Sequence, residues 1–479
     1  MPFPTFKPVK VPHVFVVLSL IVLFSGLSTY LIPSGVYQRH EVQFEGTTRN
    51  IIVPGTYRPI PKHFSLKGLL IGDHAEDKAH PTSILGFISA IPKGLNQSAA
   101  LIFYVFIIGG VFGIIKRTGT LDALVYTVFD LFKNSRIILV SSLFIGFALM
   151  ASLLGIGGEL IPLIPLLIMI AEGLGYNRIF GVSLLVIPFH IGWAAALTNP
   201  FNLQIAHMVS EVPLGSGIGF RILFFITTVI FSLLFLIIYG KRIWRRPSGS
   251  AIDENNSRPD IDFQTKLESK HIWISVAAFF LLSITFYAVN KMGWGIIEMS
   301  GAFLAVGIIS ALIGRLGEAE SVNAFIKGLE MMIVPALVVG FARGINVVLD
   351  EGLILDTILY YSANVLQKYP EIIAAEGMYI FQSMLNFFIP SASGQALVTM
   401  PLMAPLADLT GVSRLMAIFT FTCGDGFSNI IIPTNGILMA MLSIGGVPYD
   451  KWFKYIIGLF LFLSLLAGLF ILIGVLTGY

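Results

Sequence analysis

Charge and cysteine are both scarce in this chain of 479 residues. Charged side chains make up 12% of it, about half of the roughly 25% found in ordinary globular proteins, whereas apolar residues make up 56%. With a mean hydropathy of +0.85, this composition argues against a soluble fold and predicts a polytopic membrane protein. The net charge of +3 is too small and dispersed to indicate nucleic-acid binding. The single cysteine, Cys423, excludes an intramolecular disulfide and any metal cluster with several cysteine ligands.

Nine stretches are long and apolar enough to cross a bilayer, since a crossing helix needs roughly 20 apolar residues. They are 11–31, 97–115, 180–208, 220–239, 272–289, 294–313, 325–348, 415–441 and 453–476. Two further apolar pairs, 137–171 and 372–407, are each interrupted by a knot of small residues, at 155–158 and 390–394. Non-helical backbone at membrane depth persists only where it lines a protein cavity, so we expect both pairs to be re-entrant hairpins. The predicted fold is therefore all-helical.

Basic residues set the expected orientation of these crossings, because the cytoplasmic flanks of membrane helices carry an excess of Lys and Arg. Such residues follow the crossing 220–239 and precede the first one: Lys241, Arg242, Arg245, Arg246, Lys7 and Lys10. The N-terminus is therefore predicted to be cytoplasmic and, after nine crossings, the C-terminus extracytoplasmic. The first apolar run is too long for a signal-peptide core, and we expect it to remain as an anchor.

The polar loop 33–80 is predicted to lie outside the membrane as a solvated cap. It contains a β-like stretch around 49–61 that is punctuated by Pro and Gly. His63, His74 and His80 would have to come together to bind a metal ion, but they lack the spacing of standard metal ligands. We therefore expect no metal site in this loop.

The most informative feature is an internal repeat between 93–246 and 321–479. An offset of 234 or 236 pairs Gly, Pro, Arg and Asn residues in one register, which chance rarely produces. The pairs include Gly110 with Gly344, Asp122 with Asp356, Tyr126 with Tyr360, Gly158 with Gly394, Pro165 with Pro401, Arg178 with Arg414, and Asn199 with Asn435. On the expected topology the two halves run in opposite directions, and inverted repeats are the architecture of secondary transporters. The remaining expected segments are the anchor and outer loop 1–92, a cytoplasmic linker 247–270 and a scaffold helix pair 271–315.

Each repeat places a hairpin tip and, about 40 residues later, a Thr-Asn pair inside a crossing helix. Pro200 interrupts the crossing 180–208, because proline lacks an N–H group and disfavours helical dihedrals in the residue before it. Pro433 and Gly436 flank the second Thr-Asn pair, in the crossing 415–441. Two broken helices are thus expected to face two hairpin tips.

These tips and breaks supply the candidate binding residues. Unwound carbonyls and Asn or Thr oxygens suit a hard cation such as Na⁺, whereas half-helix N-termini and Ser hydroxyls suit a carboxylate. The candidate substrate-binding residues are Gly157, Gly158, Glu159, Ser391, Ser393, Gly394, Gln395, Asp425, Thr198 and Thr434, and the candidate cation ligands are Asn199, Asn202, Asn435 and Asn386, with Na⁺ at Asn199 and Asn435. The alternative is that such residues only permit close helix packing; their duplication favours a binding site. We expect no catalytic residue, and no cofactor other than Na⁺ or H⁺ as a coupling ion.

A few charges remain at membrane depth, where they are costly and indicate function. Glu159 and Asp425 are each suited to pair with a substrate ammonium or to carry a coupling proton, although a hydrogen-bonded helix kink is an equal alternative for Asp425. His190 lies in the corresponding region of the first repeat, where a structural role is favoured. Arg343 would neutralise an anion, or else pair with Asp350 or a carbonyl.

Two pairs of elements flank the hairpins. Arg178 and Arg414 each follow a hairpin and are expected to anchor it at an interface. The amphipathic stretches 121–131 and 355–367 precede the hairpins and fit interfacial helices. Such helices would link a fixed scaffold to a moving hairpin domain.

Over nearly its whole length the chain resembles the DcuC/YfcC carriers of the ion-transporter superfamily. The resemblance rests on the segment 386–395, Asn-Phe-Phe-Ile-Pro-Ser-Ala-Ser-Gly-Gln, on the run 198–202 and on the paired repeats. The resemblance implies an inner-membrane secondary carrier, a homodimer with a scaffold domain, and an elevator-type motion of the hairpin-bearing domain. Family members are labelled as C4-dicarboxylate carriers or basic-amino-acid antiporters. The first tip is Gly-Ile-Gly-Gly followed by Glu159, and it lacks the Ser-Asn-Thr sequence of the superfamily's dicarboxylate transporters, which weakens the dicarboxylate assignment.

The leading hypothesis is a cation-coupled symporter or antiporter for a small carboxylate-bearing solute, with an amino acid favoured over a C4-dicarboxylate. A passive channel is a second class, which single-channel conductance would identify. An intramembrane protease is a remote third class, because 424–426 loosely resembles an aspartyl site and Ser393 with His190 a serine dyad. The sequence lacks the second Tyr-Asp motif and a His-Glu-x-x-His motif, and a protease leaves the inverted repeat unexplained.

Overall fold

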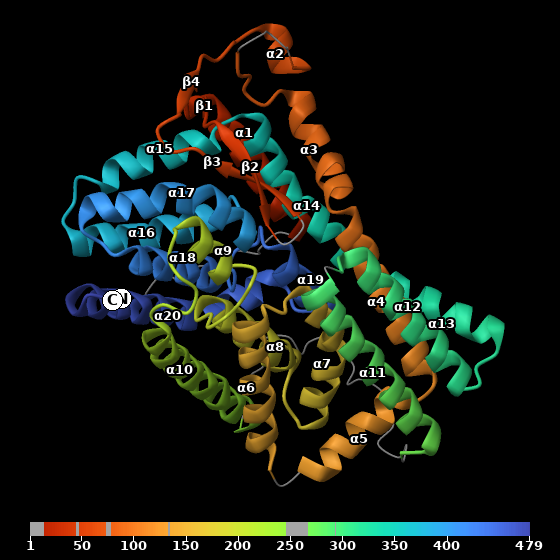
Figure 1. The fold of residues 1–479 in the computed structure, drawn as a ribbon. Helices are drawn as coiled ribbons and strands as arrows, with labels where there is room; N and C mark the ends of the chain where they lie inside the picture. Colours follow the sequence, from red (N-terminus) through yellow and green to blue (C-terminus); the bar gives the residue numbers. More distant parts are fainter. Residues whose placement is uncertain (1–13, 45–46, 73–77, 133–134, 246–266, 293) are drawn as a thin grey trace, which may run out of the picture.

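The computed structural model describes residues 14–44, 47–72, 78–132, 135–245, 267–292 and 294–479, and it is mostly helical (Figure 1). The described part of the chain begins with α1 (Val14–Leu31), which a small β region and the short α2 (Leu66–Leu70) follow. Two helices, α11 (Ser269–Met292) and α12 (Ile296–Ile313), separate two longer runs of helices that share one order of elements. The expectation of a helical membrane protein is confirmed at this level.

The helix bounds of the two runs recur at nearly fixed offsets. Adding 234 to the bounds of α3 (Ile84–Gln97) and α4 (Ala99–Arg117) gives those of α13 (Glu318–Met331) and α14 (Ile333–Glu351). The later elements correspond in the same order: α5 (Thr120–Phe132) with α15 (Leu355–Leu366), α6 (Arg136–Leu154) with α16 (Glu371–Asn386), η1 (Gly158–Leu163) and α7 (Ile164–Gly173) with α17 (Ala392–Thr410), α8 (Arg178–Ala194) with α18 (Arg414–Ser428), α9 (Leu203–Val209) with α19 (Gly436–Ile444), and α10 (Ile218–Arg245) with α20 (Tyr449–Thr477).

Six helical segments among the described residues are long and apolar enough to cross a membrane. They are Ala99–Arg117, Arg136–Leu154, Ile218–Ile243, Ile296–Ile313, Glu318–Glu351 and Tyr449–Thr477. Five of them coincide with expected crossings, and Arg136–Leu154 is one arm of the expected hairpin 137–171. Shorter apolar helices occupy Leu18–Leu31, Leu160–Gly173, Arg178–Ala194 and Ser269–Thr285. The other expected crossings and the re-entrance of the hairpins remain predictions.

Helix breaks occur inside both segments that were expected to be crossings with a Thr-Asn pair. The expected crossing 180–208 is divided into α8 and α9 by a non-helical segment at 195–202, and 415–441 is divided into α18 and α19 by one at 429–435. The crossing 325–348 is also not a single helix, because α13 and α14 meet at Met332, which has non-helical dihedrals. Pro335, in the first turn of α14, marks this joint in the sequence, because a proline there removes no helical hydrogen bond; the expectation of a single crossing overlooked it.

Close backbone contacts between helices repeat with the same offset of 234. A side chain at Gly94 in α3 would overlap the backbone of Gly340 and Gly344 in α14, and one at Gly328 in α13 would overlap the backbone of Gly109 and Gly110 in α4. Glycine permits this distance of approach because it has no Cβ. The contact of α3 with α14 is therefore the counterpart of the contact of α13 with α4.

The loop between α1 and α3 contains two antiparallel strand pairs. β1 (Ser34–Val36) pairs with β4 (Arg58–Ile60), and β2 (Arg39–Phe44) pairs with β3 (Thr47–Ile52). The loop is fastened to α15 through Asp356, which accepts from Tyr37 N at 2.8 Å and from Arg39 Nη2 at 2.8 Å. Tyr57 stacks on Tyr360 with ring centres 4.1 Å apart. The loop is thus a docked cap over the second run of helices (Figure 1).

No group of three or more His, Cys, Asp or Glu side chains gathers as a possible metal site within the described ranges. In the outer loop the rings of His63 and His80 meet edge to face, with centres 5.9 Å apart. His74 lies outside the described residues. The linker prediction, 247–270, also falls mostly outside them.

Two ion pairs at positions related by the offset of 236 lie just after the expected hairpins 137–171 and 372–407. Arg178 Nε lies 3.0 Å from Glu172 Oε1, and Arg414 Nη2 lies 2.7 Å from Asp408 Oδ2, 236 residues further on. The Arg414 hydrogen bond holds the pKa of Asp408 below its ordinary value, so this pair persists well below neutral pH. These contacts accord with the anchoring role expected for both arginines.

Candidate functional site

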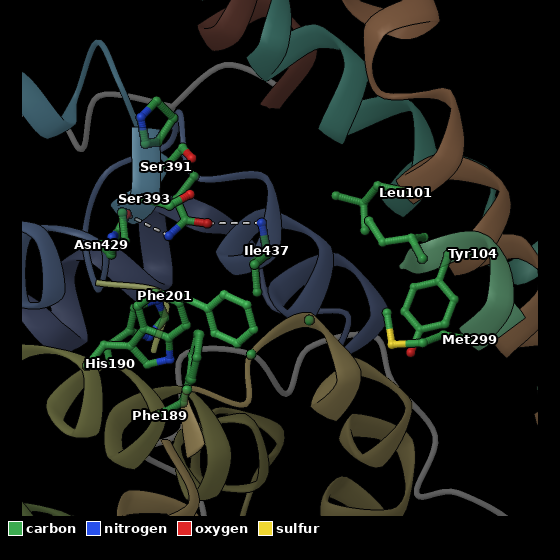
Figure 2. Close-up of a pocket in the computed structure, with 18 residues that line it drawn as sticks. Leu101, Tyr104, Phe189, His190, Phe201, Met299, Ser391, Ser393, Asn429 and Ile437 are labelled. Carbon is green, nitrogen blue, oxygen red and sulfur yellow. Dashed lines mark hydrogen bonds between the residues drawn. The ribbon is translucent and has the colours of Figure 1, made fainter. Parts of the chain in front are cut away.

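A cavity of about 430 Å³ lies where the helix breaks of the two runs of helices meet (Figure 2). Its lining comes from α4 and α12 on one side and from the helix breaks on the other. The lining residues are Leu101, Tyr104, Gly155, Gly157, Gly158, Phe189, His190, Trp193, Phe201, Ile296, Met299, Pro390, Ser391, Ala392, Ser393, Asn429, Asn435 and Ile437. Tyr104, Leu101 and Met299 face Ser391, Ser393 and Asn429 across the opening in Figure 2.

Three helices have their N-termini at this cavity. Helix α17 begins after Ser391, α19 begins after Asn435, and η1, which continues into α7, begins at Gly158. The first N–H groups of a helix have no partner within the helix and carry partial positive charge. Their convergence makes this part of the wall suited to an anionic group.

The same turn precedes the second half of each broken helix. Asn199 Oδ1 accepts from Phe201 N at 2.8 Å, and Asn435 Oδ1 accepts from Ile437 N at 2.9 Å, 236 residues further on. Asn435 also accepts from Leu438 N at 3.2 Å and so caps α19. The sequence pattern that predicted two breaks therefore produces two matching asparagine turns, with Phe201 and Ile437 directed into the cavity.

A chain of side-chain hydrogen bonds runs from the cavity to a buried acid. Asn435 Nδ2 donates to Asn429 Oδ1 at 2.7 Å (Figure 2), and Asn429 Nδ2 donates to Asp425 Oδ1 at 2.9 Å. Asp425 is fully buried and does not line the cavity. Its Oδ2 makes no hydrogen bond of ordinary geometry, although the side chain of Asn202 lies close to the carboxyl. Asp425 therefore acts on the cavity only through the two asparagines.

Several predicted residues connect helices behind the cavity wall. Gln395 Nε2 donates to Gln382 Oε1 at 2.7 Å, and Asn386 Nδ2 donates to Ser428 Oγ at 2.7 Å, so α16, α17 and α18 are joined. Asn202 caps α9 and donates from Nδ2 to Trp193 O at 2.9 Å. These side chains support the site without lining it.

The Thr-Asn pairs are placed differently from the prediction. Thr198 is exposed and donates to Leu153 O at 2.8 Å, on the side of the break away from the cavity. Thr434 is buried, and its hydroxyl has no hydrogen-bond partner. Asn199 is buried behind Gly155 and donates from Nδ2 to Ala151 O at 3.1 Å. Of these residues and Asn435, only Asn435 reaches the cavity lining.

Some of the residues predicted at the hairpin tips line the cavity and others do not. Gly157, Gly158, Ser391 and Ser393 line the cavity, whereas Gly394 lies one residue further into α17. Glu159 follows directly after this lining, but its side chain lies outside the described part of the structure.

Sequence reasoning missed the aromatic wall formed by Phe189, Trp193 and Phe201 of the first repeat. Trp193 and Phe201 are stacked with ring centres 6.5 Å apart. The offset of 236 pairs Trp193 with Asn429 and Phe201 with Ile437, so related positions of the two repeats meet at one cavity. The offset pairs these positions but does not place them at a cavity, so the sequence carried no signal that would have found Asn429 or the aromatic residues.

Two other candidates differ in their relation to the site. His190 lines the cavity; Nδ1 is 2.7 Å from Val186 O, and Nε2 has no hydrogen-bond partner. Arg343 is exposed, lies away from the cavity, and donates from Nε to Gln97 Oε1 at 3.0 Å.

Comparison with known proteins identifies related carriers. A family model described as DcuC, C4-dicarboxylate anaerobic carrier, matches residues 11–476. The chain is 29% identical over 504 residues to a protein of Escherichia coli K12 with the provisional name basic amino acid antiporter YfcC, covering 99% of this chain and 98% of that protein. It is 26% identical over 501 residues to an uncharacterised protein of Haemophilus influenzae, covering 98% of each. That the matching family consists of carriers accords with the expectation that the chain is not an enzyme.

Two solved transporters align along nearly the whole chain at low similarity. MtrF of Neisseria gonorrhoeae, described with a class of antimetabolite efflux pumps, has a TM-score of 0.39 and 16% identity over 97% of this chain and 95% of its own. The YdaH transporter of Alcanivorax borkumensis has a TM-score of 0.40 and 14% identity over 98% and 99%. At such TM-scores neither structure supports an inference about this chain.

Proposed function

Because this chain belongs to the C4-dicarboxylate anaerobic carrier family, we propose that it is a secondary active transporter of a small carboxylate-bearing solute. It works by cation-coupled symport or antiport in the inner membrane, with the N-terminus cytoplasmic and the C-terminus extracytoplasmic. An amino acid is the favoured solute, and a C4-dicarboxylate is the second candidate.

The observation that carries this proposal is the convergence of three helix N-termini at one cavity. A carboxylate at Ser391 and Ser393 lies among the N-termini of α17, α19 and η1, where the partial positive charge of the helix ends favours an anion. The caps use Gly394 N, Ile437 N and Leu438 N, so the donors to the carboxylate are the other first-turn amides. The hydroxyls of Ser391 and Ser393 add donors that adjust to the ligand.

The composition of the lining favours one carboxylate over two. Within the described residues, no Lys or Arg lines the cavity. Leu101, Tyr104 and Met299 lie opposite the serines, and the aromatic wall of Phe189, Trp193 and Phe201 completes the lining. A second carboxylate finds no positive group there, whereas an ammonium or a basic side chain is attracted to the faces of Phe189, Trp193 and Phe201. Glu159, next to the lining, is the candidate acid for the same cationic group. The name of the Escherichia coli relative supports this choice of solute.

Repeat symmetry supports alternating access by an elevator motion. The recurring helix bounds and the matching glycine contacts support two inverted repeats, which place a substrate site at their interface. The cavity lies between the helix breaks, which we assign to the moving part, and α4 with α12. The expected scaffold pair includes α12, and we assign α4 to the same fixed part because Gly307 of α12 packs against Val111 of α4. The family resemblance further implies a homodimer.

Na⁺ and H⁺ are both candidate coupling ions. For Na⁺, the proposed ligands are the oxygens of Asn199, Asn435, Asn202 and Asn386 with nearby unwound carbonyls. The oxygens of Asn199 and Asn202 each accept one backbone N–H group and keep one lone pair, whereas Asn435 Oδ1 accepts two and would have to release one of them to bind the ion. For H⁺, the acceptor is Asp425, which communicates with the cavity through Asn429 and Asn435.

Transport by purified protein in liposomes tests this function. Labelled basic and neutral amino acids and C4-dicarboxylates are offered under an inward Na⁺ gradient, an inward H⁺ gradient, or with unlabelled solute inside. We expect gradient-driven uptake or exchange of an amino acid, and its loss in the double variant Asn199→Ala with Asn435→Ala. Asn177→Ala is the matched control, since Asn177 caps α8 away from the cavity.

Absence of gradient-driven uptake and exchange for every amino acid and dicarboxylate would refute the proposal. Full transport by the double variant would refute the site. Uptake of C4-dicarboxylates alone would select the second candidate solute, and discrete single-channel currents in planar bilayers would replace the carrier by a channel.

A further inference from the structure

Arg221 is a buried cation on α10 that lies behind the broken helix of the first repeat. Its side chain is 1% exposed. Nη1 donates to Ala196 O at 3.4 Å and to Thr422 Oγ1 at 3.3 Å, and the guanidinium carbon lies 5.8 Å from the ring centre of Phe419. Hydrogen bonds from a charged donor are usually about 2.7–2.9 Å long. These contacts therefore compensate the positive charge only in part.

The other edge of this guanidinium has no partner. Nε and Nη2 are both buried and make no hydrogen bond. These two nitrogens form the fork with which arginine binds an anion through two parallel N–H groups. None of the ion pairs among the described residues includes Arg221. Burial of an unpaired charge is costly, so the structure calls for a counter-charge at this edge.

Arg221 lines a second cavity, of about 50 Å³, that is separate from the main one. The lining residues are Leu197, Thr198, Leu203, Gln204, His207, Leu214, Gly215, Ser216, Ile218 and Arg221, and none is acidic. A water needs roughly 10–15 Å³ of such space, so the cavity has room for a few waters or one small anion. Leu197 and Thr198 line this cavity and Phe201 lines the main one, so the unwound segment 195–202 separates the two.

We propose that Arg221 binds a small monovalent anion, of the size of chloride or formate, in this second cavity. The Nε and Nη2 groups donate to the anion, and the hydroxyl of Ser216 is the neighbouring donor in the lining, since the Thr198 hydroxyl already donates to Leu153 O. The anion neutralises the buried charge and ties α10 to the unwound segment. This site goes beyond the proposed function, since it requires no assumption about the transported solute.

Thermal unfolding of the purified full-length protein in detergent tests the site. Sodium gluconate is replaced stepwise by sodium chloride, sodium bromide or sodium formate at constant ionic strength. Because an anion that binds only the folded state stabilises it, we expect Tm to rise to a plateau with each small anion but not with the bulky gluconate. Arg221→Gln should remove this rise, and Arg242→Gln, an exposed arginine on the same helix, should retain it.

Two further measurements apply if Arg221→Gln does not fold. Arg221→Lys keeps the charge but loses the fork, so the half-saturating chloride concentration should rise at least tenfold. A crystal grown in bromide should give an anomalous peak next to Nε and Nη2. A wild-type Tm that is independent of the small anions, together with no bromide peak, would mean that the cavity holds water only and would overturn the proposal, as would an unchanged chloride response in either Arg221 variant.

Discussion

At the residue scale, Asn435 has two structural tasks at the main cavity. Its oxygen caps α19 and its amide nitrogen holds Asn429, which in turn holds Asp425. A single residue type at the break thus determines both the exposed N-terminus of α19 and the link to the buried acid. Asn199 makes the same turn in the first repeat but bonds to α6 instead, so equivalent residues have taken different roles.

The variant Asn435→Ala separates the stability contribution of this cap from its contribution to binding. Loss of a helix cap costs about 0.5–2 kcal/mol of stability, which a fall in Tm reports. Fraying of the first turn of α19 should also raise the Kd for the transported solute by about two- to tenfold, the equivalent of one hydrogen bond. Asn177→Ala should lower Tm similarly while leaving Kd unchanged, and an unaltered Kd in Asn435→Ala would remove α19 from the site.

At the element scale, the crossing of α8 with α18 brings the two broken helices together. Gly426 of α18 packs directly on the backbone of Ala194 in α8, where α8 ends and the first break begins. The offset of 236 pairs Gly426 with His190, so only one of these two related positions carries a side chain at the crossing. A glycine is needed there because any Cβ would overlap the α8 backbone.

Gly426→Ala should therefore destabilise the protein. Overpacking of a close helix contact typically costs about 1–3 kcal/mol, and a drop in Tm measures it. Gly458→Ala is the comparison within a helix, because nothing lies within 4 Å of a Cβ there. Alanine should leave Tm equal or higher at that position, since it is favoured over glycine in helices by roughly 0.5–1 kcal/mol. Equal Tm values for Gly426→Ala and wild type would contradict the close crossing.

At the scale of the whole molecule, the cavity joins two groups of helices that an elevator motion would separate. Gly436, at the start of α19, lies near Leu101 of α4, since a Cβ at Gly436 would be 3.9 Å from Leu101 Cδ2. This contact crosses the boundary between the parts assigned as moving and fixed. Lys93 of α3 and Glu351 of α14, whose charged atoms are 2.5 Å apart, lie on one side of it.

Cross-linking across this boundary should stop transport. In a Cys423→Ala background, Leu101→Cys with Gly436→Cys is treated with a short bifunctional thiol reagent whose linkage a reductant cleaves. We expect uptake into liposomes to fall at least tenfold on cross-linking and to recover on reduction. The pair Lys93→Cys with Glu351→Cys should keep its uptake when cross-linked. Continued transport by the first pair, once gel mobility shows the link to be complete, would exclude a motion between these parts.

Local sequence was sufficient to predict a mostly helical membrane protein and the breaks beside the two Thr-Asn pairs, although the expectation of a single crossing missed the joint between α13 and α14. Low charge and long apolar runs require membrane helices, and Pro200 and Pro433 favour a break because proline removes a helical N–H group and disfavours helical dihedrals in the residue before it. The self-match at offsets of 234 and 236 was also present in the sequence alone. It predicted related helix pairs because equal spacing of Gly, Pro and Asn imposes equal helix bounds.

Only the tertiary structure decided which predicted residues share a cavity. Asp425 and Asn386 are buried behind the wall and Thr198 faces the other side, because the direction of each side chain depends on how the broken helices cross. The aromatic wall and the buried Arg221 were equally invisible, since a Trp, Phe or Arg in an apolar run gives no sign of its neighbour. Sequence thus determined where the backbone must unwind, and packing between distant segments determined which chemical groups meet there.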